Sequence, residues 1–455
     1  MAIGGGRHGT KKTGESQKYK LFTVEHSYFS GKIRAYLRWK HYHGALGDGF
    51  EDILATPELL EKLIMPKSGV PSLPQIEAPD GTWLQDSSVI FDHIEAQHPQ
   101  VPAVADAKNA PRQCLASYLI ELLADEWLIV PACRARWHFS RSGVSPSHLT
   151  FNEQQWGAWL APDGTGTQRR QAGAGFFEAS FGISQADSDT PKGPFEGLGQ
   201  LGMTAETEAA WLASLENIMS ILEHHLTQHD YLFGGQPCLA DFALMGPFYA
   251  HFYRDAVPGF DLRRRFPLTA EWVERTHGHD NINARSYAQN LYSYDGAGLI
   301  ARPATSDGGA WLPDDAIPDG VQRLISVFFS EMWPVLKTAT QCLTQFIKSD
   351  AHQMGDELPR KSFTASPGFE AFQTQGGALT HAFTLGGATG ERMVVANQMW
   401  MLQRLRPIAL ACTASPAARD WLNGFDKDGD LLAVDAMMDG YRIAKQGGKI
   451  YSATA

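Results

Sequence analysis

The sequence predicts an α/β domain at its N-terminal end, followed by a long and mostly helical remainder. An apolar run at 20–24 ends in polar residues and passes into a stretch at 32–39 whose apolar positions recur at helical spacing. A strong turn signal at 79–82 lies between two short apolar segments, which indicates a β-hairpin leading into a helix at 88–95. Helical periodicity then resumes at Arg112 and recurs far downstream.

The strand, turn and helix at 20–39 place Ser27 at the start of the helix. Free backbone amides and the positive end of the helix dipole favour an anion there, and a thiolate supplied by a small peptide qualifies. Ser27 also stands where a capping serine would stand, and taken alone that is the better interpretation. His26 next to it suggests an acid–base pair, but adjacent residues on a turn usually point apart.

A proline opens the second segment of interest. Pro74 at the start of a strand leaves the N–H and C=O of Leu73 free to pair with an extended peptide. Because only about 5–6% of X-Pro bonds are cis in folded proteins, the sequence does not decide the isomer. In isolation Pro74 is an ordinary edge-strand residue.

Asp86 and Ser87 open the helix at 88–95. A carboxylate beside a helix N-terminus can hold an ammonium group, while exposed amides and a hydroxyl can hold a carboxylate. A free α-amino-acid group carries both. Asp86 by itself is explained as well by capping its own helix.

In these segments the chain resembles the glutathione S-transferase superfamily, in which a thioredoxin-like domain precedes an all-helical domain. The turn at 27–34 is similar to the family's Ser/Cys-Pro-Phe-Ser turn, with Tyr28 in place of the proline. Leu73–Pro74 is similar to its cis-proline pair. The joint order and spacing of the segments make the resemblance specific.

The resemblance also assigns expected contacts to glutathione. Asp86–Ser87 is similar to the pair that binds the γ-glutamyl end, and thirteen residues separate Pro74 from Ser87, close to the family's spacing. Lys67 is expected to reach the glycine carboxylate, although an exposed lysine is more often simply solvated. Glutathione is therefore the expected co-substrate.

A second similarity lies at 231–242, which is like a structural stretch of the family's helical domain. The family has a capping hydroxyl residue followed three positions later by an aspartate, and here Cys238 replaces the hydroxyl residue ahead of Asp241. Because a thiol is a weak acceptor, this cap should be weaker by about 1 kcal/mol. Asp241 is then expected to carry more of the capping.

The expected organisation has four parts: a disordered tail at 1–18, a thioredoxin-like domain at 19–98, a helical domain at 111–280, and a mostly helical extension at 281–455. The stretches 161–175 and 184–202 are rich in glycine and are expected to be loops around a short helix. In the extension, helices are predicted at 321–332, with a kink at Pro334, and at 392–411, and a strand at 383–385. The extension resembles that of a long bacterial subset of the superfamily.

Composition limits the classes of function. The 455 residues are 43% hydrophobic and 20% charged, and no stretch approaches the roughly 20 apolar residues that span a bilayer. The net charge of −11 argues against a nucleic-acid partner. The first residues lack the apolar core of a signal peptide, so a cytoplasmic protein is expected, without a membrane partner. The five cysteines show no disulfide or zinc pattern.

The resemblance implies a reaction. The Ser27 hydroxyl would donate to the glutathione sulfur and hold it as a thiolate, which attacks a small hydrophobic electrophile bound by the helical domain. Conjugation or cleavage of an ether or halide is favoured, as in detoxification, and a homodimer is expected by resemblance. Five residues near the start of the helical domain are candidate contacts for the electrophile, although core packing is the better role for the tryptophans: Trp127, Arg134, Arg136, Trp137 and His138.

Two alternatives stay open. A non-catalytic protein could keep the scaffold, with or without glutathione, and use the extension as a partner surface; the departures at Tyr28 and Cys238 favour it. A glutathione-dependent disulfide reductase or peroxidase is the third possibility. Because a serine at position 27 cannot form a mixed disulfide with glutathione, thiol-transfer chemistry is disfavoured.

Overall fold

The computed structural model describes residues 18–181, 194–278, 292–301, 309–358 and 379–455. The expected tail at 1–18 lies outside these ranges except for Lys18. The N-terminal sheet has the order β2-β1-β3-β4, with β1 parallel to β2 and antiparallel to β3. Its strands are β1 (Tyr19–Thr23), β2 (Phe50–Leu54), β3 (Gln75–Glu77) and β4 (Trp83–Gln85).

Two helices follow the strands that border the site. α1 (Tyr28–Tyr42) connects β1 to β2, and α4 (Ser87–Gln97) follows β4. Three short helical segments lie between β2 and β3, the strand that follows Pro74: α2 (Pro57–Leu59), the π-helical η1 (Leu60–Ile64) and α3 (Met65–Ser68). The predicted strand–turn–helix and the hairpin around 79–82 are both present, which confirms an α/β N-terminal domain.

The helical domain packs around α11, which is buried along its whole length. α11 lies against α1 of the first domain and α5 of its own domain, as expected of a helix that is apolar on all sides. The helices are α5 (Pro111–Glu126), α6 (Ile129–Phe139), α7 (Pro146–Leu160), α8 (Gly166–Phe181), α9 (Pro194–Gln200), α10 (Glu208–His225), α11 (Leu239–Pro247), the π-helical η3 (Phe248–Tyr253), α12 (Ala256–Arg265) and α13 (Pro267–His277).

The start of α11 shows how Cys238 is accommodated. Asp241 Oδ2 accepts the backbone N–H of Cys238 at 3.0 Å and its thiol at 3.2 Å. Asp241 Oδ1 accepts the N–H of Leu232 at 3.1 Å and the indole N–H of Trp272 at 2.9 Å. The prediction that Asp241 carries the cap is confirmed.

The loops expected at 161–175 and 184–202 are partly wrong. Residues 166–175 lie within α8, and 194–200 form α9; 182–193 lie outside the described residues. Glycines weaken an isolated helix, but here they let α7 and α8 approach closely, because a Cβ at Gly157 or Gly173 would collide with the backbone of the facing helix. Tertiary packing therefore overrides the local preference.

The described part of the extension contains three β-hairpins among its helices. Its elements are β5 (Tyr292–Tyr294), β6 (Leu299–Ala301), α14 (Asp319–Val327), the π-helical η4 (Phe328–Met332), α15 (Trp333–Ile347), β7 (Thr380–Leu385), β8 (Ala388–Met393), α16 (Ala396–Cys412), α17 (Pro416–Asn423), α18 (Val434–Met438), β9 (Tyr441–Gln446) and β10 (Lys449–Thr454). The predicted strand at 383–385 belongs to β7, and the helix predicted from 392 begins at Ala396. Where a kink at Pro334 is expected, the π-helical turn η4 precedes α15.

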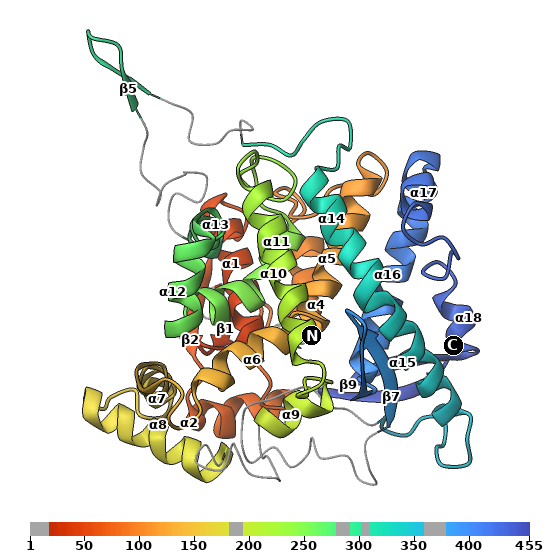
Figure 1. Ribbon diagram of the computed structural model, residues 1–455, viewed down its shortest axis with the longest axis horizontal. Coiled ribbons are helices and arrows are strands. Elements are labelled where there is room, and N and C mark those ends of the chain that lie inside the picture. The colour runs from red at the N-terminus through yellow and green to blue at the C-terminus, as the bar shows by residue number, and fades with distance from the viewer. Residues whose placement is uncertain (1–17, 182–193, 279–291, 302–308, 359–378) are drawn as a thin grey trace, which may run out of the picture.

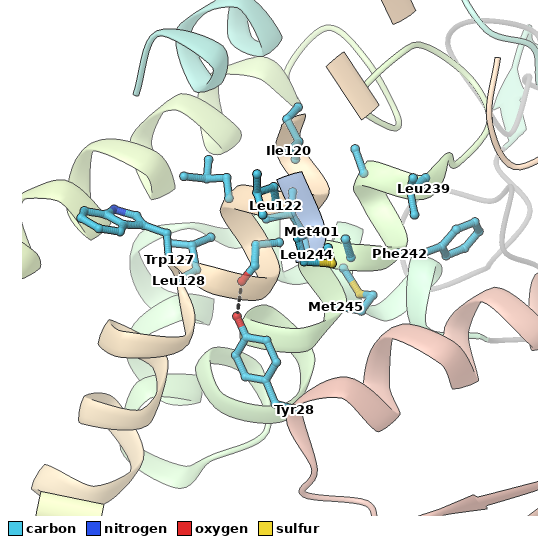
Figure 2. Packing of buried hydrophobic residues seen from close by; sticks show 14 of the residues in the cluster. Tyr28, Ile120, Leu122, Trp127, Leu128, Leu239, Phe242, Leu244, Met245 and Met401 are labelled. Atoms are coloured by element: carbon cyan, nitrogen blue, oxygen red, sulfur yellow. Dashed lines mark hydrogen bonds between the residues drawn. The ribbon is translucent and has the colours of Figure 1, made fainter. Parts of the chain in front are cut away.

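Figure 1 shows α14–α18 gathered on one side of the helical domain, away from α7 and α8. The extension also enters the core. In Figure 2 Met401 of α16 lies beside Leu122 of α5 and Leu244 of α11, and all three are buried. None of the described helices has both the length and the apolar character needed to cross a bilayer.

Candidate functional site

Three sequence segments meet at one edge of the sheet. Phe22 of β1 lies opposite Gln75 of β3, and Gln75 lies opposite Gln85 of β4, so the three residues form one row across the sheet. β1 and β4 end at this edge, and β3 begins there. Ser27, Leu73–Pro74 and Asp86 all follow or precede that row by a few residues, which brings the predicted segments together.

Ser27 lies at the N-cap position of α1 with extended backbone and makes no side-chain capping bond. Its backbone is fixed on both sides, because its N–H donates to Val24 at 3.1 Å and its C=O accepts from Gly31 at 3.4 Å. Within the described residues no hydrogen bond engages the Ser27 hydroxyl. Capping therefore does not account for this side chain.

His26 points into a different environment. Its ring packs against the Trp156 ring in a tilted arrangement, with centroids 4.4 Å apart, and it is buried. Burial, reinforced by Arg136 and Arg254, holds the pKa of His26 well below its usual value. A neutral, buried imidazole is a packing residue rather than an acid–base partner of Ser27.

Tyr28, in place of the family's proline, links the two domains. Its hydroxyl donates to the carbonyl oxygen of Ala124 in α5 at 2.6 Å, the dashed line in Figure 2. Its ring packs so close to Gly246 of α11 that a Cβ at that glycine would collide with the ring. The substitution thus replaces a rigid turn residue with a contact that positions α1 against the helical domain.

The peptide bond between Leu73 and Pro74 is cis. The buried Gln75 side chain holds the preceding loop, because its amide donates to the carbonyls of Val70 and Ser72 at 2.9 Å each. In the described structure no hydrogen bond engages the N–H or C=O of Leu73. Its backbone is open to pair with a guest, as the sequence predicts.

Asp86 has an unusual backbone conformation, with φ +90°, which costs energy for a residue other than glycine. Its Oδ1 accepts the N–H of Ser88 at 3.0 Å, so Asp86 does cap α4. Its Oδ2 accepts from Lys445 of β9 at 2.6 Å. Burial would raise the pKa of Asp86, but Lys445 and Lys32 outweigh it, and the pKa is lowered.

The remaining predicted residues lie nearby in the chain. Ser87 is buried as the first residue of α4, and none of the described residues forms a hydrogen bond with its hydroxyl. Lys67 is exposed on α3, ahead of the cis-proline loop. Its reach to a ligand stays a prediction.

A buried ionic network lies behind the site, and sequence analysis assigned it no role. Lys32 of α1 is fully buried and donates to Glu121 at 2.7 Å and Asp125 at 2.5 Å, both on α5. Burial alone would lower the pKa of Lys32, but the two carboxylates outweigh it, and the pKa is raised. Arg404 of α16 then donates to Glu121 at 2.5 Å and to both oxygens of Asp92 on α4.

The candidate electrophile contacts on α5 and α6 are mostly engaged elsewhere. Trp127 and Trp137 are 1% exposed, which confirms core packing for the tryptophans. Arg136 is buried, pairs with Asp255 at 2.8 Å and donates to the carbonyl of His26. Arg134 pairs with Glu208 at 2.7 Å. Of the five candidates, only His138 is half-buried and has no ion pair in the described structure. The buried Arg136 and the two tryptophans are engaged in the core and are not substrate contacts.

Neither Lys445 nor Arg404 was found as a site residue from the sequence. Lys445 lies 359 positions from Asp86 and Arg404 lies 312 from Asp92. No spacing rule connects residues so far apart. Only the path of the extension across α4 and α5 brings them to the site.

Two family models match the chain. One described as "Glutathione S-transferase, N-terminal domain" matches 21–102, and one described as "Glutathione S-transferase, C-terminal domain" matches 205–275. The first covers all three segments at the sheet edge, and the second covers the Asp241 cap. A comparison with curated proteins gave no match.

Solved structures of similar chains share only part of this one. A glutathione S-transferase from Methylobacterium radiotolerans, in complex with glutathione sulfonate, is 20% identical over 61% of this chain and 99% of its own, with a TM-score of 0.32. The β-etherase LigF from a Sphingobium strain is 16% identical over 58% of this chain and 96% of its own, with a TM-score of 0.36. At these scores neither structure bears on the reaction.

Proposed function

Because the chain belongs to the glutathione S-transferase superfamily, we propose that it binds glutathione at the sheet edge and activates the thiol for attack on a small hydrophobic electrophile. One observation carries the proposal. The Ser27 hydroxyl, the open backbone of Leu73 and the start of α4 lie at the same edge of the sheet. A tripeptide needs these three kinds of contact: a donor for its sulfur, a backbone partner for its extended middle, and a site for its charged end.

The thiol chemistry follows from the start of α1. A free cysteine thiol has a pKa of about 8.5, and the amides and dipole of a helix N-terminus lower this pKa. The Ser27 O–H donates to the sulfur and favours the thiolate, while Ser27 itself forms no bond to the substrate. The thiolate then forms a C–S bond to the electrophilic carbon, and the leaving group departs with the electron pair of the bond that breaks.

Conjugation, or cleavage of an ether or halide, fits this step better than thiol transfer, because serine offers no second sulfur. We further propose a cytoplasmic homodimer acting in detoxification. A non-catalytic scaffold stays the alternative. The extension is the surface that it would use.

The test is a Ser27→Ala variant, with Ser415→Ala as its matched control. Ser415 is also a half-buried N-cap serine without a side-chain capping bond, at the start of α17. We expect Ser27→Ala to lower kcat/KM toward a chloro-aromatic electrophile about 100-fold, the usual cost of removing one donor to a developing or stabilised anion. Glutathione binding, measured by calorimetry, should change little, and Ser415→Ala should behave as the wild type.

Other outcomes are equally informative. Unchanged turnover in Ser27→Ala would remove the role assigned to Ser27. Turnover of a disulfide but of no chloro-aromatic compound would select the reductase. Binding that is abolished by combining Asp86→Ala with Ser87→Ala would locate the site at α4. Absence of glutathione binding both by the wild type and by a variant without the Lys445 charge would favour the scaffold.

A further inference from the structure

The last β-hairpin of the chain closes one end of the proposed site. Lys445 of β9 donates to Asp86 Oδ2 at 2.6 Å, and both side chains are less than one-fifth exposed. Since Asp86 Oδ1 already accepts from Ser88, both carboxylate oxygens have partners inside the protein. Asp86, the carboxylate expected to hold a ligand's ammonium group, is therefore already paired with an ammonium group of the protein.

Two side chains of α16 fix Lys445 in this position. Its ammonium lies over the Trp400 ring of α16, 3.3 Å from the centroid. The Gln403 side chain bonds both the N–H and the C=O of Ile443, at 2.5 and 3.0 Å, which attaches β9 to α16. The next residue, Arg404, joins α16 to α4 through Asp92. Lys445 is thus positioned by α16, which is itself bound to α4 by the ion pair between Arg404 and Asp92.

The tip of the hairpin reaches the other side of the site. Gly447 and Gly448 form the turn with φ +54° and +70°. A Cβ at Gly69 would come within 2.9 Å of the Gly447 carbonyl oxygen, and one at Gly448 would collide with Val70. The hairpin therefore spans from the loop before Leu73 to the start of α4.

We propose that Lys445 takes the place of the ligand's α-ammonium group at Asp86, and so determines the specificity of the site. The inference rests on the proposed function. A glutathione amine would face the Lys445 charge instead of a free carboxylate, and it gains nothing from Asp86. A thiol peptide whose acyl end carries a carboxylate without an α-amine keeps the contacts with Ser87 and the α4 amides. Such an amine-free thiol should bind at least as tightly as glutathione.

The experiment compares two ligands on the full-length chain by calorimetric titration: glutathione and glutaryl-cysteinylglycine, which differs only by lacking the amine. The variants are Lys445→Met and Lys445→Gln, which remove the charge, and Lys445→Arg, which keeps it. Lys449→Met is the matched control, because Lys449 lies on the same hairpin but is exposed and pairs with Glu357.

We expect the wild type, Lys445→Arg and Lys449→Met to bind the amine-free thiol at least as tightly as glutathione. In Lys445→Met the ratio of the two Kd values should shift at least tenfold in favour of glutathione. Lys445→Gln should shift the ratio in the same direction, so the test does not depend on one variant folding. Glutathione binding that appears only in the neutral variants would also support the proposal.

Two results would overturn it in distinguishable ways. A wild type that prefers glutathione at least tenfold, with Lys445→Met unchanged, would refute the role of Lys445 and leave the proposed function standing. Absence of binding of either thiol by the wild type and by both neutral variants would refute the glutathione site itself, and the specificity with it.

Discussion

At the C-terminal end of α5, the side chain of Glu126 is buried beside the network that supports the site. Its Oε1 accepts from the Asn397 amide of α16 at 2.7 Å. Burial, reinforced by the charge of Asp125, raises the pKa of Glu126 to about 7. The pKa of Asp125 is raised as well, chiefly by burial. Glu126 is thus a titratable residue of the core that also contacts α16 of the extension.

Glu126 gives a prediction about pH. Because its pKa is higher in the folded than in the unfolded state, its neutral form stabilises the fold below about pH 4.5, and that stability is lost as pH rises through 7. Glu126→Gln mimics the neutral form at every pH. Relative to the wild type, its free energy of unfolding should therefore rise by about 1.4 kcal/mol for each pH unit between 5 and 7.

Urea denaturation at pH 5, 6, 7 and 8 measures this difference, which should level off above pH 7. The control is Glu51→Gln, at an exposed position on β2, where no such trend is expected. A difference between Glu126→Gln and the wild type that does not vary with pH would contradict the assignment.

At the scale of elements, α5 depends on a cap from the extension. Its own N-cap residue is Ala110, which offers no side-chain acceptor. Asp315 supplies it instead, because its two oxygens accept the N–H groups of Arg112 and Gln113 at 2.9 Å each. The N-terminus of α5, the helix that carries Glu121 and Asp125, is thus capped by a residue about two hundred positions later in the chain.

We predict that Asp315→Ala destabilises the chain by about 1–2 kcal/mol, the usual cost of losing such a cap. Asp314→Ala is the control, because Asp314 shares the left-handed backbone, with φ +56° against +53°, and no capping bond of its side chain is found in the described structure. The difference between the two thermal midpoints therefore measures the cap together with the ion pair between Asp315 and Arg112, at 3.1 Å, and leaves backbone strain out. Equal midpoints would show that the cap contributes nothing.

The elements also show where local patterns succeed and fail. Apolar runs and turn signals predicted β1, α1, the hairpin of β3 and β4, and β7, because each of these signals lies within a short contiguous stretch of sequence. Among them, β7 buries alternate residues, as a strand with one face on the core does. The same signals missed α8, since Gly173 serves a close contact with α7 instead of a loop. The helix predicted from Arg392 begins at Ala396, because residues 392–393 still belong to β8, which ends at Met393.

For the whole molecule, the extension is part of the core rather than an appendage. Arg404 is 10% exposed and joins α16 to the buried Glu121. Burial would raise the pKa of Glu121, but Arg404 and Lys32 outweigh it, and the pKa is lowered. Met401 packs beside α5 and α11 of the helical domain (Figure 2) and is buried. We therefore expect the extension and the two domains to unfold together.

Arg404→Met should lower the free energy of unfolding by about 3–5 kcal/mol, because it leaves a buried carboxylate without one of its partners. Arg406→Met, on the same helix, should cost less than about 1 kcal/mol, since Arg406 pairs with the largely exposed Asp435. Circular dichroism and tryptophan fluorescence should report one coincident transition in each protein. An earlier, separate transition in Arg404→Met would show that the extension folds on its own.

The sequence by itself determined the two-domain architecture, the segments that resemble a glutathione site, and the capping role of Asp241. These depend on short-range spacing, on residue chemistry and on a resemblance carried by contiguous motifs. The cis isomer at Pro74, which the resemblance implies, is confirmed. Only the tertiary structure decided that the Ser27 hydroxyl has no hydrogen-bond partner among the described residues and that Lys445 pairs with Asp86. The physical reason is distance along the chain: a buried ion pair between such remote residues is set by how the elements pack, and no local pattern encodes that packing.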